Sequence, residues 1–309
     1  MTKLFEIKEM IINLYTRFER AIVPIGKFLL FFIVLVLTNG FFNSKLSISE
    51  FLMMVLLATI SIFIPASWIV ILIIAFISFQ LVAISLEATL TLAIAMLIIY
   101  LLFIRIYPKM AYFVILVPLL FALKIGYVIP IFAGLFFGPS AIIAVCTGVL
   151  VFKFATYIPG LLQLQSESLY DMPQTIMLMY KYMVNIMITD TSILLTIIVF
   201  AAVLIVTYIV SKLEYDYVWY IAIGAGTTVN MLGFIIGILI LKSDISIIGV
   251  LIGSIVAGAI CAAAQFMRFS LDYPRTEKVQ FEDETYYYFV KAVPKVKITR
   301  KEKAITKIK

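Results

Sequence analysis

Long apolar stretches that carry almost no charge constrain this chain more than any other feature. Several of them reach about 18 residues or more, the length that an α-helix needs to cross a hydrocarbon core of about 30 Å. Only 13% of the 309 residues are charged, whereas soluble proteins average about 25%. The mean hydropathy is +1.15. A soluble domain with this composition would expose apolar surface on every side, so the sequence predicts an all-α polytopic integral membrane protein.

The apolar stretches divide the chain into predicted helices that are separated by turns. We expect an amphipathic interfacial helix over 1–21, a transmembrane domain over 22–267 and a basic cytoplasmic tail over 268–309. For the helix over 1–21, packing on the protein's own surface is the alternative to lying on the membrane. The clearer spans are predicted at 22–41, on either side of a break at Pro65 within 49–84, and at 86–104, 191–211, 217–241 and 246–267.

Segment 110–156 does not divide cleanly into spans. It contains several prolines and glycines, with Lys124 among them. Its length suits two spans, or one span joined to broken half-helices. Backbone breaks at membrane depth are tolerated only where protein or a wet cavity satisfies the backbone groups, and secondary transporters often build solute sites from them. We therefore predict a broken or re-entrant segment here.

Lysine and arginine residues gather at both ends of the chain. The first 27 residues hold five of the 24, and the residues from Arg268 onward hold eleven. Because such clusters favour the cytoplasmic side, we predict that both termini are cytoplasmic. The composition, rich in Ile, Lys and Tyr, resembles that of bacterial inner-membrane proteins, so we expect a plasma (inner) membrane location. Termini on one side require an even number of crossings, and we predict about eight, with six or ten as the alternatives.

The residue types on which most intramembrane catalysis depends are missing. The chain has no histidine and two cysteines, which excludes His-dependent proteolysis, acyl transfer and His-ligated metals. Phosphate-loop, GxSxG and GxGxxG motifs do not occur. We therefore predict no enzymatic activity, no cofactor and no metal site, and we expect no nucleic acid as a partner.

Residues at the breaks and in one polar patch are the candidates for a solute path. They are Lys124, Pro130, Gly138, Thr227, Thr228 and Asn230. A charged or polar side chain in hydrocarbon needs an interior partner, which places such residues inside the protein. Two alternatives stay open: Lys124 reaches an interface, and the polar patch ties helices together.

Small residues at four-residue spacing in the last two spans predict close helix packing. They are Gly233, Gly237, Gly249, Gly253 and Ala257. Packing between helices of one subunit is the main interpretation, and a homo-oligomer is the alternative.

The tail combines an aromatic cluster with basic residues. The stretch VQFEDETYYYFVKAV is typical of strand, acidic turn and strand, which predicts a β-hairpin. A lone hairpin is marginally stable, so we expect a protein partner. A disordered tail or one lying on the membrane surface is the alternative. The candidate docking residues are Phe281, Tyr286, Tyr287, Tyr288 and Phe289.

Two functions follow from these features. The multi-span layout, the broken segment and the polar patch predict a permease-like component that moves a small or lipid-like solute, acting with a partner. The aromatic tail and the shortage of buried charge favour the alternative, a membrane scaffold of an envelope, secretion or cell-shape complex that recruits partners through its tail.

Overall fold

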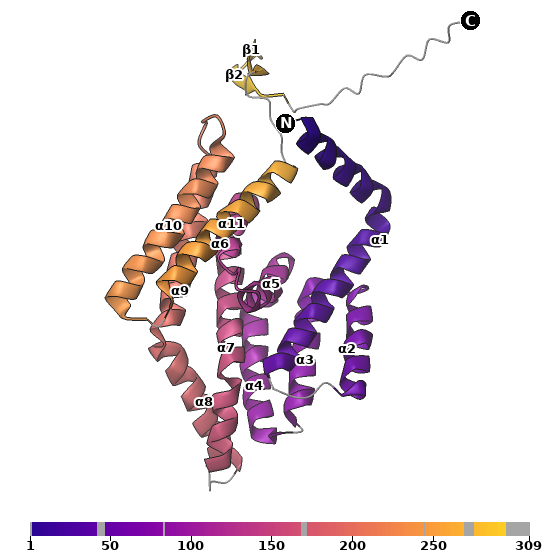
Figure 1. The fold of residues 1–309 in the computed structure, drawn as a ribbon, viewed down its shortest axis with the longest axis vertical. Coiled ribbons are helices and arrows are strands. Elements are labelled where there is room, and N and C mark those ends of the chain that lie inside the picture. The colour runs from indigo at the N-terminus through magenta and orange to yellow at the C-terminus, as the bar shows by residue number, and fades with distance from the viewer. Residues whose placement is uncertain are drawn as a thin grey trace, which may run out of the picture.

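The part of the chain that the structure describes is built mainly from helices, with a small two-stranded sheet toward the C-terminus (Figure 1). The computed structural model describes residues 2–41, 47–82, 84–167, 172–243, 245–268 and 275–294. The longer elements are α1 (Thr2–Phe41), α2 (Ile48–Ser61), α3 (Ala66–Val82), α4 (Leu86–Ile99), α7 (Ala141–Glu167), α8 (Met172–Thr189), α9 (Thr191–Ser211), α10 (Val218–Leu241) and α11 (Ile247–Arg268). The shorter ones are η1 (Tyr100–Ile104), η2 (Pro108–Met110), α5 (Ala111–Ala122) and α6 (Val128–Phe136).

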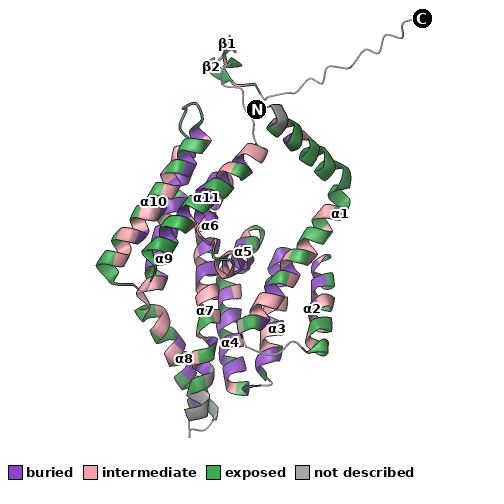
Figure 2. Cartoon of the chain, viewed as in Figure 1, coloured by how far each residue is buried: buried purple, intermediate pink, exposed green. Residues whose placement is uncertain are grey.

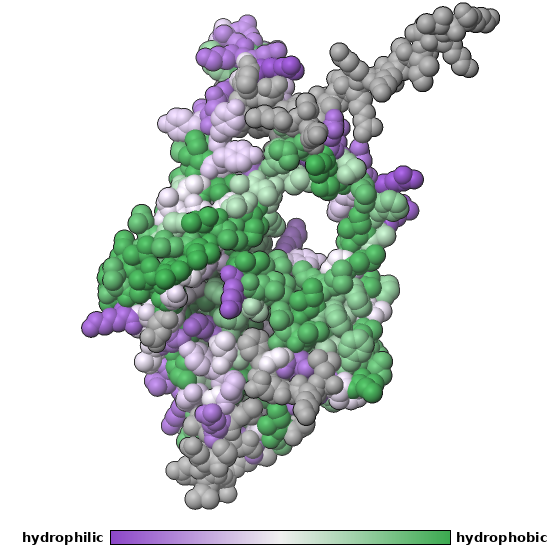
Figure 3. All heavy atoms as spheres, viewed as in Figure 1, coloured by the Kyte–Doolittle hydropathy of each residue, from purple (hydrophilic) through white to green (hydrophobic). Residues whose placement is uncertain are grey.

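Many of the described helices are apolar and expose apolar side chains. Six are long and apolar enough to cross a membrane: α1, α4 with η1, α7, α9, α10 and α11. Figure 3 shows a broad apolar surface between two more polar ends of the molecule. Large apolar side chains stand out from it, such as Ile248 with 70% of its surface exposed. Lipid is the solvent that suits such a surface, since apolar area in water is unfavourable by about 25 cal/mol per Å².

The N-terminal helix joins two predicted elements. The interfacial helix and the first span form the single 40-residue helix α1, whose backbone leaves helical geometry at Phe18 (φ −112°, ψ 18°). Pro24 lies inside α1, six residues after this kink. The break predicted at Pro65 is confirmed, because α2 ends at Ser61 and α3 begins at Ala66.

Segment 110–156 is broken, as predicted, into α5, α6 and the first part of α7. α5 has 12 residues and α6 has 9, so at about 1.5 Å per residue they extend about 18 Å and about 14 Å. Neither can cross a core of about 30 Å alone. In Figure 1, α5 is seen nearly end-on, crosswise to α4 and α7.

The break between α5 and α6 has a defined backbone geometry. Lys124 adopts a left-handed conformation (φ 61°). Its N–H donates to the carbonyl of Phe121 at 2.9 Å, and the N–H of Ile125 donates to that of Leu120 at 2.8 Å. This hydrogen-bond pair is the Schellman motif, which ends a helix by satisfying its last carbonyls.

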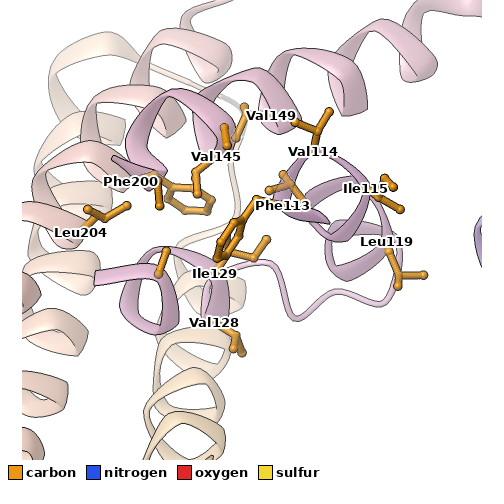
Figure 4. Packing of buried hydrophobic residues seen from close by; sticks show 14 of the residues in the cluster. Phe113, Val114, Ile115, Leu119, Val128, Ile129, Val145, Val149, Phe200 and Leu204 are labelled. Atoms are coloured by element: carbon orange, nitrogen blue, oxygen red, sulfur yellow. The ribbon is translucent and has the colours of Figure 1, made fainter. Parts of the chain in front are cut away.

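The core lies where α5 and α6 pack against α7 and α9. Figure 4 shows apolar side chains of all four helices pointing toward one another, among them Phe113, Ile129, Val145 and Phe200. Phe121 stacks on Phe200, with 5.7 Å between the ring centroids. Figure 2 shows that buried residues gather on the inner helices of the described chain, whereas exposed residues are frequent on α1, α10 and α11.

Gly134 sets the close approach of α6 to α9. A Cβ atom on Gly134 would lie 2.7 Å from the carbonyl oxygen of Leu204 and 2.9 Å from Cβ of Thr207. We expect Gly134→Ala to lower the free energy of unfolding by about 1–3 kcal/mol, because backbone cannot move aside cheaply. Gly224→Ala is the control, since nothing lies within 4 Å of its added Cβ, and it should stabilise by up to about 1 kcal/mol. Denaturant unfolding in detergent measures both, and equal effects would contradict the account.

The hairpin predicted in the tail is confirmed. Strands β1 (Glu277–Glu282) and β2 (Tyr287–Ala292) pair antiparallel, with Phe281 opposite Tyr288. An ion pair of 2.6 Å between Lys291 and Asp216 connects the hairpin to the turn between α9 and α10. Residues 269–274 and 295–309 of the predicted basic tail, 268–309, lie outside the described residues.

The start of α1 and the end of α11 lie at the same end of the molecule (Figure 1). Nζ of Lys8 donates to the carbonyl of Phe266 at 2.7 Å. The rings of Phe5 and Phe266 lie 5.4 Å apart. The hairpin lies at this end too (Figure 1).

Candidate functional site

Three of the residues predicted to line a solute path have roles at helix ends. Lys124 is exposed in the left-handed position that closes α5. Gly138 follows α6 with φ 78°, and its N–H donates to the carbonyl of Ala133 at 3.0 Å. Pro130 is buried in the first turn of α6, where its missing N–H costs no helical hydrogen bond. A left-handed backbone favours glycine, which explains Gly138 directly.

The polar patch of α10 makes bonds within its own helix and to α11. The hydroxyl of Thr227 donates to the carbonyl of Gly224 at 2.8 Å, and that of Thr228 donates to the carbonyl of Ala225 at 2.8 Å. Asn230 is fully buried and donates to Oγ of Ser254 on α11 at 2.7 Å. These contacts correspond to the helix-tying alternative, and none of the six candidates lines either pocket described below.

Three of the five small residues predicted to pack helices do so between helices of this chain. A Cβ on Gly233 would lie 3.1 Å from Cγ1 of Val199 on α9, and one on Gly237 would collide with Leu195 of the same helix. A Cβ on Gly253 would lie 2.5 Å from the ring of Tyr127. The remaining two differ from each other: Ala257 is fully buried, whereas Gly249 is exposed on α11.

An apolar inner pocket lies beside the broken segment. Its volume is about 80 Å³, and α1, α3, α4, η1, α5 and α7 all contribute to its walls. Side chains such as Leu92, Ile115 and Ile158 line it, and the polar side chains among its described lining residues are Thr38 and Ser78. The hydroxyl of Thr38 donates to a carbonyl of its own helix. The walls therefore suit an apolar group. An ion or a sugar would lose its hydration there without gaining enough hydrogen bonds from the walls.

A second, more open groove of about 660 Å³ lies between α1, α6 and α11. Ile12 and Tyr15 form one wall, and Phe132 and Phe136 form another. Arg268 closes the third side, with its guanidinium carbon 4.7 Å from the ring centroid of Phe136. α1 thus contributes to both pockets, whereas α5 lines the inner pocket and α6 lines the groove.

A cluster of charged and polar groups joins α7 to the start of α9. Nζ of Lys153 lies 3.2 Å from Oδ2 of Asp190, and the hydroxyl of Tyr157 donates to the same oxygen. The other carboxylate oxygen accepts the N–H of Ser192 at 2.8 Å, so Asp190 is also the N-cap of α9. The side chains of Lys153 and Asp190 are 23% and 15% exposed. The pair is therefore largely withdrawn from solvent.

The hairpin presents its aromatic side chains to the outside. Tyr286, Tyr287 and Phe289 are 64%, 70% and 79% exposed. Phe281 and Tyr288 instead stack on each other, with 4.9 Å between ring centroids. The predicted docking residues thus divide into one stacked pair, Phe281 and Tyr288, and three more exposed rings.

Asp283 organises the turn of the hairpin. Its carboxylate accepts the N–H groups of Thr285 and Tyr286 at 2.8 and 2.7 Å and the hydroxyl of Tyr288 at 2.8 Å. These hydrogen bonds hold the pKa of Asp283 below its ordinary 3.8. The hydrogen bond to Asp283 raises the pKa of Tyr288.

The lowered pKa of Asp283 predicts how the turn responds to acid. A depressed folded-state pKa means that the stabilisation is present above the ordinary pKa and is lost as pH falls through the folded-state value. In full-length protein labelled with ¹⁵N-tyrosine, the amide resonance of Tyr286 should move with a midpoint below 3.8. Asp283→Asn should abolish this transition, and a midpoint at or above the ordinary value would contradict the assignment.

Comparisons with known proteins give no relative. No protein-family model matches the chain, and neither a curated protein nor a solved structure is significantly similar to it. Within the described ranges, no three His, Cys, Asp or Glu side chains gather into a group that could hold a metal ion. The pockets, the Lys153–Asp190 ion pair and the hairpin are the features that bear on function.

Proposed function

We propose that this chain is a permease-like membrane component that moves a small apolar or lipid-like solute, acting with a partner protein. The observation that carries the proposal is the apolar inner pocket between α1, α3, α4, α5 and α7. An apolar cavity has no affinity for water and accepts apolar ligands. About 80 Å³ accommodates part of an acyl chain or a small apolar molecule.

The proposal includes a topology of eight crossings with both termini in the cytoplasm of a plasma-membrane protein. α1, α4 with η1, α7, α9, α10 and α11 are long and apolar enough to cross. The 14-residue α2 and the 17-residue α3 would supply the other two crossings, and α5 with α6 would form the re-entrant piece. The shared end of α1 and α11 supports termini on one side. Helix breaks at membrane depth are common where transporters bind their solutes.

Photolabelling with a lipid tests the class of solute. The protein is placed in vesicles with phosphatidylcholine that carries a diazirine on its acyl chain, irradiated and digested. We expect adducts on the pocket walls within 92–96 and 151–158, as well as on the lipid-facing surface. Adducts confined to outward positions such as Ile248 and Leu239 would contradict a lipid-like solute in the pocket.

The hairpin favours a second candidate, a membrane scaffold that recruits partners of an envelope, secretion or cell-shape complex. The three exposed aromatic rings of Tyr286, Tyr287 and Phe289 are the observation behind it. Aromatic residues are enriched in protein interfaces. A chain lacking 279–309 should insert normally yet lose activity in cells if this candidate holds. Full activity of that truncated chain would contradict it.

A further inference from the structure

The inner pocket between α1, α3, α4, α5 and α7 has one polar end. Its two polar lining residues are Thr38, near the end of α1, and Ser78, near the end of α3. A hydrogen bond of 2.6 Å from Nε2 of Gln80 to Oδ1 of Asn39 joins these two helix ends. Because Asn39 follows Thr38 directly and Gln80 lies two residues after Ser78, both hydroxyls belong to the same end of the pocket.

The two hydroxyls differ in what they can offer to a bound molecule. The hydroxyl of Thr38 donates to the carbonyl of Leu35 at 2.8 Å, so its oxygen is left as an acceptor. The hydroxyl of Ser78 has no hydrogen-bond partner among the described residues, so it can both donate and accept. Together they can satisfy one hydroxyl group, which is itself one donor and an acceptor.

The rest of the wall limits what else the molecule can carry. The other side chains that line the pocket are apolar, such as Val34, Val70 and Met96, and none of the described lining residues is charged. A carboxylate or a phosphate would therefore lose its hydration without meeting a cation. A plain hydrocarbon would cover the Ser78 hydroxyl and leave it without a hydrogen bond.

We infer that the inner pocket binds a small neutral alcohol, with its hydroxyl between Thr38 and Ser78 and its hydrocarbon chain along the apolar walls. A volume of about 80 Å³ suits a short chain or the first part of a longer one. An apolar chain without the hydroxyl can still enter, with lower affinity. The inference rests on the proposed function, because it names the class of solute that the same pocket prefers.

Photolabelling with three matched probes tests this preference. Purified full-length chain in detergent is irradiated with octanol, octane or octanoate, each carrying a diazirine at the same chain position and present at equal concentration in the detergent phase. We expect octanol to label the pocket walls within 92–96 and 151–158 about fivefold more than octane, the effect of about one neutral hydrogen bond. Octanoate should label these walls least.

Substitution of the two hydroxyls tests the residues. Ser78→Ala should reduce octanol labelling about fivefold, to the level of octane. Ser67→Ala is the matched control, because Ser67 is a buried serine of the same helix outside the pocket lining, and it should label like wild type. Thr38→Val covers the case in which Ser78→Ala fails to fold, since it replaces the oxygen by a methyl group of similar size and should also weaken octanol labelling.

The outcomes separate this inference from the proposed function. Equal labelling by octanol and octane, or octanol labelling that stays unchanged in both Ser78→Ala and Thr38→Val, would overturn the inference and leave an apolar solute in the pocket. A lack of pocket labelling by all three probes would overturn the inference and the proposed function together. Preferred labelling by octanol in a chain that exchanges no lipid between leaflets would support the inference and contradict only transport.

Discussion

Replacing Asp190 by alanine is expected to destabilise the protein by about 3 kcal/mol or more. The change leaves the ammonium group of Lys153 largely withdrawn from solvent without its carboxylate. It also removes the acceptor of the Tyr157 hydroxyl and the cap on the N–H of Ser192. A loss of helix capping alone costs about 1 kcal/mol. Unfolding in mixed micelles, followed by tryptophan fluorescence, measures the change.

The ion pair between Lys291 and Asp216 offers a matched control. Asp216 and Lys291 are 54% and 44% exposed, so Asp216→Ala should change the free energy of unfolding by less than about 1 kcal/mol. Adding Lys153→Met to Asp190→Ala should recover part of the loss, because the unpaired charge is then gone. Similar effects of Asp190→Ala and Asp216→Ala would show that the inner pair is not withdrawn from solvent.

Filling the inner pocket is expected to exclude the acyl chain of a lipid from it. Ala93 of α4 lines the pocket, and a phenylalanine ring there would take up most of about 80 Å³. We expect Ala93→Phe to reduce lipid photolabelling within 151–158 by about tenfold, which corresponds to about 1.4 kcal/mol of binding free energy. Labelling of the outer surface should not change.

Ala259→Phe controls for the substitution itself. Ala259 is exposed on α11 and does not line the pocket, so labelling of 151–158 should match that of wild type. Undiminished labelling in Ala93→Phe, with thermal stability unchanged, would show that the lipid reaches 151–158 from outside the pocket.

Much of the fold follows from local sequence signals. Uninterrupted apolar runs predict the long helices, and Pro65 predicts the break between α2 and α3. The acidic turn after Phe281 predicts the hairpin. The continuity of α1 was not predictable in this way. The interfacial helix and the first span are continuous across Pro24, and α1 leaves helical geometry at Phe18, where the sequence carries no proline or glycine.

The site was harder to predict because it depends on contacts between distant segments. Lys153 lies in the middle of α7, which continues to Glu167, and it meets Asp190 from 37 residues further on. Two separate signals could have predicted the pair: Lys153 is a lysine within an apolar helix, and Asp190 is an acid at the junction of two helices. Both pockets are lined mainly by ordinary apolar residues, which carry no pattern that distinguishes them from core.

The measurement that tests the central claim most directly is the exchange of a fluorescent phospholipid between leaflets. Purified wild-type chain is reconstituted into vesicles, and an impermeant reductant bleaches the probe in the outer leaflet. Downhill exchange needs no energy source, so the chain alone should expose nearly all of the probe, with Ala93→Phe slower and Ala259→Phe like wild type. A protected fraction that stays near one half, as in vesicles without protein, would contradict the proposal that this chain moves lipid-like solutes.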